Sequence, residues 1–255
     1  MKNSPLLSFS LLNYTIFKGD LSECKSDKKT LINTINQYSF CIAQKDAEFK
    51  KALQGSDVLL PDGMAIVVAA RLLQNTKITK IAGAELHDFL LQKLNQTGGS
   101  CFYLGASQNT LDKIKNRINV AFPNIKVYNY SPPFKTVFSD SDNQAMLEAV
   151  NDVAPDVLFV GMTAPKQEKW SFQHKEFLQA KTICSIGAVF DFYAGTVKRP
   201  SPFWIRLRLE WFIRLIKEPK RMWKRYLYYG PVFIGYIVRE KFRLIFNNSS
   251  IRTNN

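Results

Sequence analysis

Short apolar segments recur along this chain of 255 residues, and amphipathic helical patterns separate them. The segments that suit strands are Thr30–Ile35, Val58–Leu60, Cys101–Leu104, Val127–Tyr130, Val157–Val160 and Thr182–Ile186. One helical face is formed by Leu86, Phe89, Leu90 and Leu94, and another by Phe40, Ala43, Ala47 and Leu53 before Gly55. Strands that alternate with helices are typical of βαβ units. The sequence therefore predicts an α/β fold with a mostly parallel sheet flanked by helices.

The positive charge gathers in the last part of the chain. The net charge is +14, and residues 198–255 hold fourteen Lys or Arg against three Glu, which is a net of +11. Three of the four Trp lie in the same stretch. The two prolines of Arg199-Pro-Ser-Pro202 predict a boundary between a nearly neutral body, residues 1–198, and a basic aromatic appendage, residues 199–255. Such an appendage can lie on an anionic membrane, bind nucleic acid, clamp a phosphorylated ligand or form a solvated face; Trp and Tyr among Lys and Arg favour the membrane.

The composition disfavours several classes of protein. The four cysteines form no CxxC pair, so we expect reduced thiols in a cytosolic protein, with Cys101 and Cys184 in the core. The two histidines, His87 and His174, lie in helical patterns and are expected to be structural or exposed. No apolar run approaches the roughly 20 residues that span a bilayer. We interpret the N-terminal segment as the start of the fold rather than a signal peptide.

Polar residues and glycines follow several of the predicted strands. Ligands of open α/β sheets bind where parallel strands end, so these residues are candidates for one cleft. Asp62 follows Val58–Leu60 and is the best candidate for a general base, although a helix cap or turn explains such a position equally well. Gly105 and the glycines at 161 and 187 suit either a phosphate or a simple turn.

Other residues of the later segments carry alternative interpretations. Glu168 and Asp191 are either acids of the cleft or caps and ion-pair partners. Asp140-Ser-Asp142 has the spacing of a metal-binding DxD motif, but helix capping explains it better. Arg214, Arg221 and Arg225 have the spacing of one helix face, suited to a diphosphate or to solvent and lipid, and Pro219 is expected to interrupt that helix.

Several segments together resemble one family of bacterial glycosyltransferases, the WecG/TagA/CpsF type. They are Thr34-Ile35-Asn36, LLPDGMAIVVAARLL (59–73), FYLGAS (102–107), SPPF (131–134), PDVLFVGMTAPKQEKW (155–170), GAVFDFYAGTVKRPSPFW (187–204) and LEWFIRLIKEPKRMWKRY (209–226). The family includes the teichoic-acid N-acetylmannosaminyltransferase and the enterobacterial common antigen N-acetylmannosaminuronyltransferase. The segments occur in the family's order and cover nearly the whole chain.

The resemblance implies a Rossmann-like single catalytic domain with a helical C-terminal appendage. It implies transfer, with inversion, of a sugar from a UDP-sugar to a sugar on polyprenyl diphosphate, at the cytoplasmic face of the membrane. No cofactor, DxD-bound metal or nucleic acid is expected, and residues 199–255 would meet an anionic membrane. Asp62 matches the family's proposed base. The expected substrate-binding residues are Thr34, Asn36, Gly63, Lys80, Gly105, Gln167, Asp191, Arg214, Arg221 and Arg225.

The chain departs from the family pattern in two places. Lys80-Ile-Ala-Gly-Ala-Glu85 stands where the family often has Arg-Val-x-Gly-x-Asp, and a Lys does not replace a bidentate Arg. The Pro-Glu that often follows Asn36 is replaced by Gln37-Tyr38. The transferred sugar is therefore left open. Two alternatives from other classes are a nucleic-acid-binding module and a peripheral membrane adaptor with a catalytically idle body.

Overall fold

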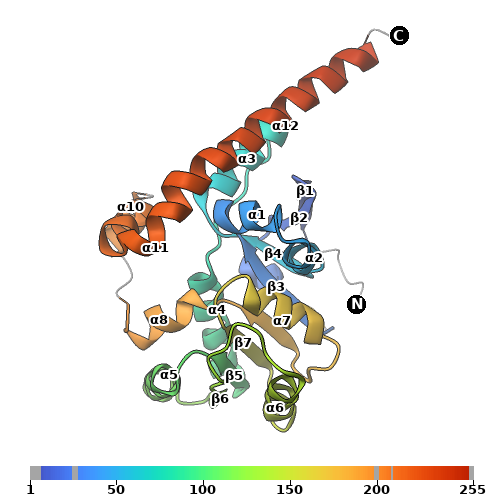
Figure 1. The fold of residues 1–255 in the computed structure, drawn as a ribbon. Helices are drawn as coiled ribbons and strands as arrows, with labels where there is room; N and C mark the ends of the chain where they lie inside the picture. The colour runs from blue at the N-terminus through green and yellow to red at the C-terminus, as the bar shows by residue number, and fades with distance from the viewer. Residues whose placement is uncertain (1–6, 25–27, 198–200, 208, 253–255) are drawn as a thin grey trace.

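The centre of the protein is a six-stranded parallel sheet with the strand order β4-β3-β8-β7-β5-β6 (Figure 1). The computed structural model describes residues 7–24, 28–197, 201–207 and 209–252. The strands are β3 (Thr30–Ile35), β4 (Val58–Pro61), β5 (Ser100–Gly105), β6 (Lys126–Tyr130), β7 (Val157–Gly161) and β8 (Thr182–Ser185). Each of them coincides with a predicted segment to within one residue at either end. The predicted α/β fold with a parallel sheet is confirmed.

Helices cover both faces of this sheet. They are α1 (Gln37–Ala43), α2 (Ala47–Gln54), α3 (Met64–Gln74), α4 (Gly83–Thr97), α5 (Gln108–Ala121), α6 (Asp140–Asn151), α7 (Lys166–His174) and α8 (Ala188–Ala194). One layer of the core lies between the sheet and the helices α4, α5 and α8. On the opposite face, α6 and α7 pack against β5, β7 and β8. A third cluster joins α1, α2 and α3 to an N-terminal hairpin.

The N-terminal hairpin was not predicted. Its strands β1 (Ser8–Leu11) and β2 (Tyr14–Phe17) are antiparallel, and Leu12 and Asn13 form the turn with positive φ angles of 51° and 67°. The short helix η1 (Leu21–Glu23) follows. Strands of four residues joined by two residues without glycine carry little of the usual hairpin signal. Leu11, Tyr14 and Ile16 are buried in the cluster around α1, whereas Phe17 belongs to the core layer with α4 and α5.

The apolar face predicted before Gly55 is divided between two helices. Helix α1 ends at Ala43, and Asp46 begins α2 by accepting a hydrogen bond from the backbone N–H of Phe49 at 3.0 Å. The apolar pattern continues across this break, because both helices bury their apolar residues in the same cluster. The pattern alone therefore does not reveal the break. The aspartate cap is the local signal that separates them.

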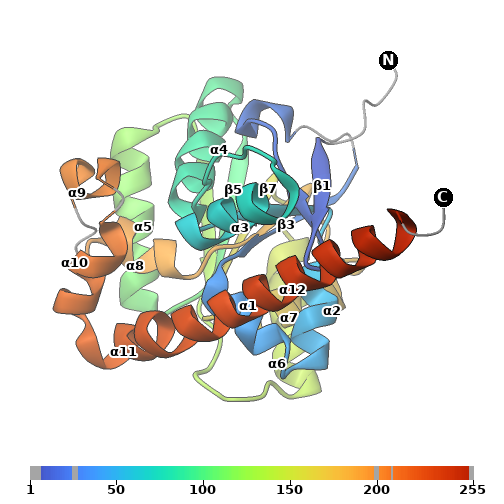
Figure 2. The same cartoon turned by 90° about the horizontal axis from the view of Figure 1, so that it is seen from above.

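The appendage is helical and interrupted. It contains α9 (Pro202–Arg206), α10 (Glu210–Lys217), α11 (Pro219–Trp223), a π-helical segment η2 (Lys224–Tyr228) and α12 (Tyr229–Arg252). The break at Pro219 confirms the expected interruption. The first part of α12 packs on the body through buried Tyr229, Phe233 and Ile237, and its far end extends beyond the body (Figures 1 and 2). Among the described residues, none of the helices combines the length and the apolar character needed to cross a membrane.

Candidate active site

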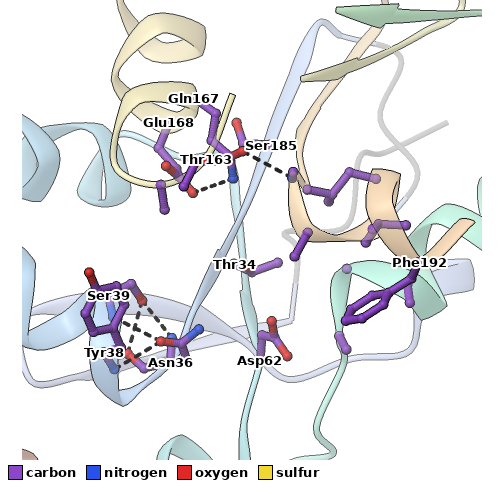
Figure 3. Close-up of a pocket in the computed structure, with 18 of the residues that line it drawn as sticks. Thr34, Asn36, Tyr38, Ser39, Asp62, Thr163, Gln167, Glu168, Ser185 and Phe192 are labelled. Atoms are coloured by element: carbon purple, nitrogen blue, oxygen red, sulfur yellow. Dashed lines mark hydrogen bonds between the residues drawn. The ribbon is translucent and has the colours of Figure 1, made fainter. Parts of the chain in front are cut away.

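A cleft with an open volume of about 970 Å³ lies where β3, β4, β7 and β8 end. We call it the main cleft. Its walls come from the loops after these strands, from the first turns of α1, α4, α7 and α8, and from two arginines of the appendage. Figure 3 shows Thr34 between Asp62 and the Gln167–Glu168 pair, with Phe192 of α8 at the side. The main cleft therefore lies at the carboxyl ends of parallel strands, where the sequence predicts the site.

Asp62 lies in the turn between β4 and α3. Its backbone N–H donates to the carbonyl oxygen of Ile35 at 2.9 Å, which ties the turn to the end of β3. Gly63 follows with a φ of 140°, a conformation that disfavours any residue with a Cβ, and it begins α3. Asp62 lines the main cleft with a half-buried side chain. A carboxylate in this position can accept a proton from a bound hydroxyl group.

Thr34 and Asn36 come from the end of β3 and the start of α1. Thr34 lines the main cleft as the last but one residue of its strand. The side-chain oxygen of Asn36 caps α1 by accepting hydrogen bonds from the backbone N–H groups of Tyr38 and Ser39, both at 3.0 Å. The cap therefore uses the oxygen of Asn36, and its amide NH₂ is the part that can serve a ligand.

Gln167 and Glu168 form a buried pair in the first turn of α7. The amide of Gln167 donates to Glu168 Oε1 at 2.9 Å and accepts from the backbone N–H of Gly187 at 3.1 Å. Glu168 is 3% exposed, and its Oε2 has no hydrogen-bond partner among the described residues. Burial raises the pKa of Glu168 to about 7, against the opposing effects of the Gln167 hydrogen bond and the charge of Arg225.

Two of the three predicted arginines reach the main cleft. The guanidinium of Arg214, on α10, lies 5.3 Å from the centre of the Phe192 ring, and its buried Nε has no hydrogen-bond partner among the described residues. Arg225, on η2, lies 4.6 Å from the centre of the Tyr38 ring. The side chain of Arg221 lies outside what the structure describes. Asp191, on α8, lines the same cleft.

A second hollow adjoins the main cleft beneath the appendage and has an open volume of about 1800 Å³. Its apolar lining is Met64, Ala65, Val67, Ile78, Trp211 and Tyr226, and its basic lining is Lys80, Arg206, Arg214 and Arg225. Gly63 and the predicted Lys80 belong to this hollow rather than to the main cleft. Asp62, Asn36, Tyr38, Arg214 and Arg225 line both spaces.

Gly105 lies apart from the other predicted site residues. It ends β5, which is separated from β8 by β7, and the described residues that line the two spaces do not include it. Its φ is 113°, and a Cβ there would lie 2.6 Å from the carbonyl oxygen of Gly161. Close packing of two strand ends therefore explains this glycine. The strand order, which the sequence pattern does not give, separates it from the cleft.

The remaining chemical candidates have structural roles. Asp142 and Ser139 form a reciprocal cap at the start of α6, which confirms the capping interpretation of the DxD spacing. Cys101, Cys184 and His87 are buried, and His174 stacks on Trp170, as expected. Within the described part of the chain, no three His, Cys, Asp or Glu side chains gather where they could hold a metal ion.

Several lining residues were not predicted. Tyr38, Thr163, Ser185 and Phe192 line the main cleft, and Trp211 and Tyr226 line the second hollow. Glu168 also lines the main cleft, in agreement with the first of its two interpretations, an acid of the cleft. A signal was available for two of the residues that were not predicted, because Tyr38 is two residues after the predicted Asn36 and Phe192 directly follows the predicted Asp191. Thr163 and Ser185 are next to none of the predicted site residues. Trp211 and Tyr226 stand among the arginines of the appendage.

Comparison with known proteins identifies the family of this chain. Residues 8–246 match the glycosyl transferase WecG/TagA/CpsF family. The chain belongs to this family. A relative from Bacillus subtilis (strain 168), named N-acetylglucosaminyldiphosphoundecaprenol N-acetyl-beta-D-mannosaminyltransferase, is 32% identical over 217 residues, which is 84% of this chain and 82% of the relative.

Two further relatives carry the same name. The protein of Bacillus spizizenii is 29% identical over 231 residues, 89% of this chain and 88% of the relative. The protein of Staphylococcus aureus (strain MW2) is 24% identical over 217 residues, 85% of this chain and 83% of the relative. This WecG/TagA/CpsF member is accordingly a glycosyltransferase, and the alternatives with a catalytically idle body are not favoured.

Proposed function

We propose that this protein transfers an N-acetylmannosaminyl group, with inversion, from a UDP-sugar to N-acetylglucosamine carried on a polyprenyl diphosphate. The names of the Bacillus and Staphylococcus relatives support this choice of sugar and acceptor. The reaction needs room for a sugar nucleotide, room for a lipid diphosphate, and a base between the two.

The observation that carries the proposal is the position of Asp62 in the lining of both spaces. A donor in the main cleft and an acceptor in the second hollow would meet at this carboxylate. Asp62 would accept the proton of the acceptor hydroxyl as its oxygen attacks the anomeric carbon of the donor. A single displacement of this kind inverts the configuration at that carbon, and the UDP leaves with the bonding electrons.

Arg214 and Arg225 are suited to the leaving diphosphate. The buried Nε–H of Arg214 has no acceptor among the described residues, and phosphate oxygens bind guanidinium groups in a bidentate manner. We propose that Gln167 and Asp191 hold the rest of the donor and that Thr34 and the amide of Asn36 orient the reacting groups. Arg214 and Arg225 would stabilise the negative charge that develops on the leaving UDP, without a metal ion.

The second hollow is suited to the acceptor. Its apolar side chains can contact a polyprenyl chain, and its basic side chains can hold a diphosphate. We propose that Lys80 contributes as a single positive charge where the family often has an arginine. Gly63 lines the same hollow, at the start of α3.

We propose further that residues 1–198 form the catalytic body and that residues 199–255 bind the anionic inner face of the plasma membrane. Of the 22 large apolar side chains that are exposed among the described residues, fourteen belong to residues 203–246. Their number and the surplus of Lys and Arg in this segment support attachment to an anionic lipid surface.

The test is UDP release by the purified full chain with detergent-dispersed polyprenyl-diphosphate N-acetylglucosamine and a panel of UDP-sugars. We expect UDP-N-acetylmannosamine to react in the presence of EDTA. Asp62→Asn should lower kcat by roughly a hundredfold or more, because the amide cannot accept the proton. Asp140→Asn is the matched control, since Asp140 is exposed in α6, away from both spaces.

Each part of the proposed function has its own contradicting result. UDP release from another UDP-sugar would show that a different sugar is transferred, and loss of activity in EDTA would show that a metal ion is needed. Full activity of the Asp62 variant would overturn the role of Asp62 as base.

A further inference from the structure

Glu168 is a buried carboxyl group with one oxygen left open in the wall of the main cleft. One oxygen, Oε1, accepts from Gln167 at 2.9 Å, whereas Oε2 has no hydrogen-bond partner among the described residues. The side chain is 3% exposed and lines the cleft. Leaving such an acceptor unsatisfied in a buried place is costly, so a native site normally supplies a donor.

The protein itself holds the pair in a fixed orientation. The amide oxygen of Gln167 accepts from the backbone N–H of Gly187 at 3.1 Å, and a Cβ at position 187 would lie 2.3 Å from that oxygen. The Gln167 amide therefore joins α7 to the loop after β8 and cannot turn to serve Oε2 without losing this bond. The open oxygen of Glu168 is thus available to a ligand rather than to Gln167.

The main cleft offers a ligand both a hydrogen-bond donor and a hydrogen-bond acceptor. Within the described part of the chain, Arg214 Nε is a donor without a hydrogen-bond partner and Glu168 Oε2 is an acceptor without one. A sugar nucleotide offers both partners, because its phosphates accept hydrogen bonds and its hydroxyl groups donate them. A carboxylate repels a diphosphate, so Glu168 suits the hydroxyl-bearing parts of such a ligand and the arginines suit its phosphates.

We propose that Glu168 contacts the substrate and that its Oε2 accepts a hydrogen bond from a hydroxyl group of the sugar nucleotide. This inference rests on the proposed function, since it takes the main cleft as the donor site. The hydroxyl belongs either to the ribose or to the transferred sugar, and the two sources predict different results. Glu168 is then a determinant of donor affinity that is separate from the base Asp62.

Binding should also release a proton. Burial raises the pKa of Glu168 to about 7, so the empty protein carries this carboxyl partly protonated at neutral pH. A donated hydrogen bond favours the carboxylate and lowers its pKa. The other titratable or charged side chains that line the cleft are Tyr38, Asp62, Asp191, Arg214 and Arg225. Affinity for a sugar nucleotide should therefore rise as the pH increases through about 7.

The experiment is calorimetric titration of the full chain with UDP and with UDP-N-acetylmannosamine, in the absence of acceptor. Glu168→Gln keeps the shape and the oxygen that Gln167 needs. We expect it to weaken binding by tenfold or more, because a hydrogen bond to a charged group is lost. Glu176→Gln, at an exposed position just beyond α7, is the matched control and should bind as the unmodified protein does.

The two ligands identify the hydroxyl. Weaker binding of both UDP and UDP-N-acetylmannosamine assigns it to the ribose, and weaker binding of the UDP-sugar alone assigns it to the transferred sugar. The proposal is overturned if Glu168→Gln binds both ligands within twofold of the unmodified protein. A protein that binds neither ligand before any substitution would instead overturn the proposed function, and this inference with it.

A second measurement needs no variant. Titration of the unmodified protein with UDP-N-acetylmannosamine at pH 7, in two buffers of different ionisation enthalpy, counts the protons exchanged on binding. The UDP-sugar is the ligand to use, because its phosphates are diesters, whereas a terminal phosphate titrates near pH 6 and adds its own proton. We expect net release of protons, and net uptake or none would contradict the proposal.

Discussion

The guanidinium group of Arg225 lies over the ring of Tyr38, 4.6 Å from its centre. This contact joins η2 of the appendage to the first turn of α1, and both residues line the main cleft and the second hollow. A cation over an aromatic ring is attracted to its face, so this contact helps to hold Arg225 at the place where the two spaces meet. The position of this guanidinium therefore depends on Tyr38 as well as on the appendage.

Arg225→Lys keeps the charge and removes the planar group. We expect kcat/KM for the UDP-sugar to fall by about tenfold or more, because Lys has no planar fork that can make two parallel hydrogen bonds. Steady-state kinetics with the lipid-linked acceptor measures this. Arg243→Lys is the control, since Arg243 pairs with Glu240 on α12, away from both spaces. Equal kcat/KM values for the two variants would show that the guanidinium group of Arg225 does not contribute to the reaction.

Gly187→Ala places a methyl group against the oxygen of Gln167, where a Cβ would lie 2.3 Å away. The Gln167 side chain must then give up its bond to the backbone N–H at 187. We expect a folded protein whose affinity for UDP falls by about tenfold, measured by calorimetry. Gly235→Ala on α12 meets nothing within 4 Å and should raise stability by about 0.5 to 1 kcal/mol without changing affinity. Unchanged affinity in the first variant would show that Gln167 does not need this bond.

His87 makes stability depend on pH. It is 2% exposed, lies 2.5 Å from the hydroxyl of Tyr103, and burial lowers its pKa to about 3 from an ordinary value of 6.5. Between pH 6.5 and about pH 3, His87 is therefore protonated in the unfolded chain and neutral in the folded chain. The stabilising contribution is complete above pH 6.5 and declines as the pH falls toward 3.

The measurement is denaturant unfolding between pH 7 and pH 4, compared with His87→Gln. We expect the free energy of unfolding of the unmodified protein to fall more steeply than that of the variant, by up to about 1.4 kcal/mol per pH unit. His174→Gln is the control and should keep the steep dependence. Parallel pH curves for the unmodified protein and His87→Gln would contradict this assignment.

Phe242 and Phe246 provide a test of the membrane surface. Their rings stack with centres 6.5 Å apart on α12 and are 56% and 66% exposed. Replacing both with Ala should weaken sedimentation with vesicles that contain phosphatidylglycerol by about fivefold or more, because both rings lose burial in the lipid. Phe134→Ala removes an exposed ring of the body and should change nothing. If the double variant of Phe242 and Phe246 sediments with vesicles as the unmodified protein does, this end of α12 is not the lipid-facing part.

The strands of the sheet could be predicted because each is a short apolar run with a helix after it. The hairpin at residues 8–17 could not, since its two strands are joined by a turn without glycine and their burial depends on contacts with α1 and α2. The pattern also could not show that Tyr229, Phe233 and Ile237 are core residues of the body. Aromatic residues in a basic segment suit a lipid surface as well as a protein core, and contacts with α1, such as Tyr38 with Tyr229 and Phe40 with Phe233, decide between them.

Within the site, Asp62, Thr34, Asn36, Gln167, Asp191, Arg214 and Arg225 were predicted and line one cleft. These residues could be predicted because they follow predicted strands or belong to the motifs that resemble the family. The division into two spaces was not predictable, because Lys80 and Arg214 are brought together by the path of the appendage over α3. Nor did the sequence show that Glu168 is buried beside Gln167, since adjacent helical residues usually face different ways.

The packing of Phe40 against Phe233, with ring centres 5.2 Å apart, has a consequence for synthesis on the ribosome. The two residues are 193 positions apart, so the cluster around α1 stays open while every strand of the sheet has already been made. An emerging chain must carry this exposed apolar surface until α12 arrives. Chaperones that shield apolar surface on nascent chains should therefore remain bound to this protein until late in translation.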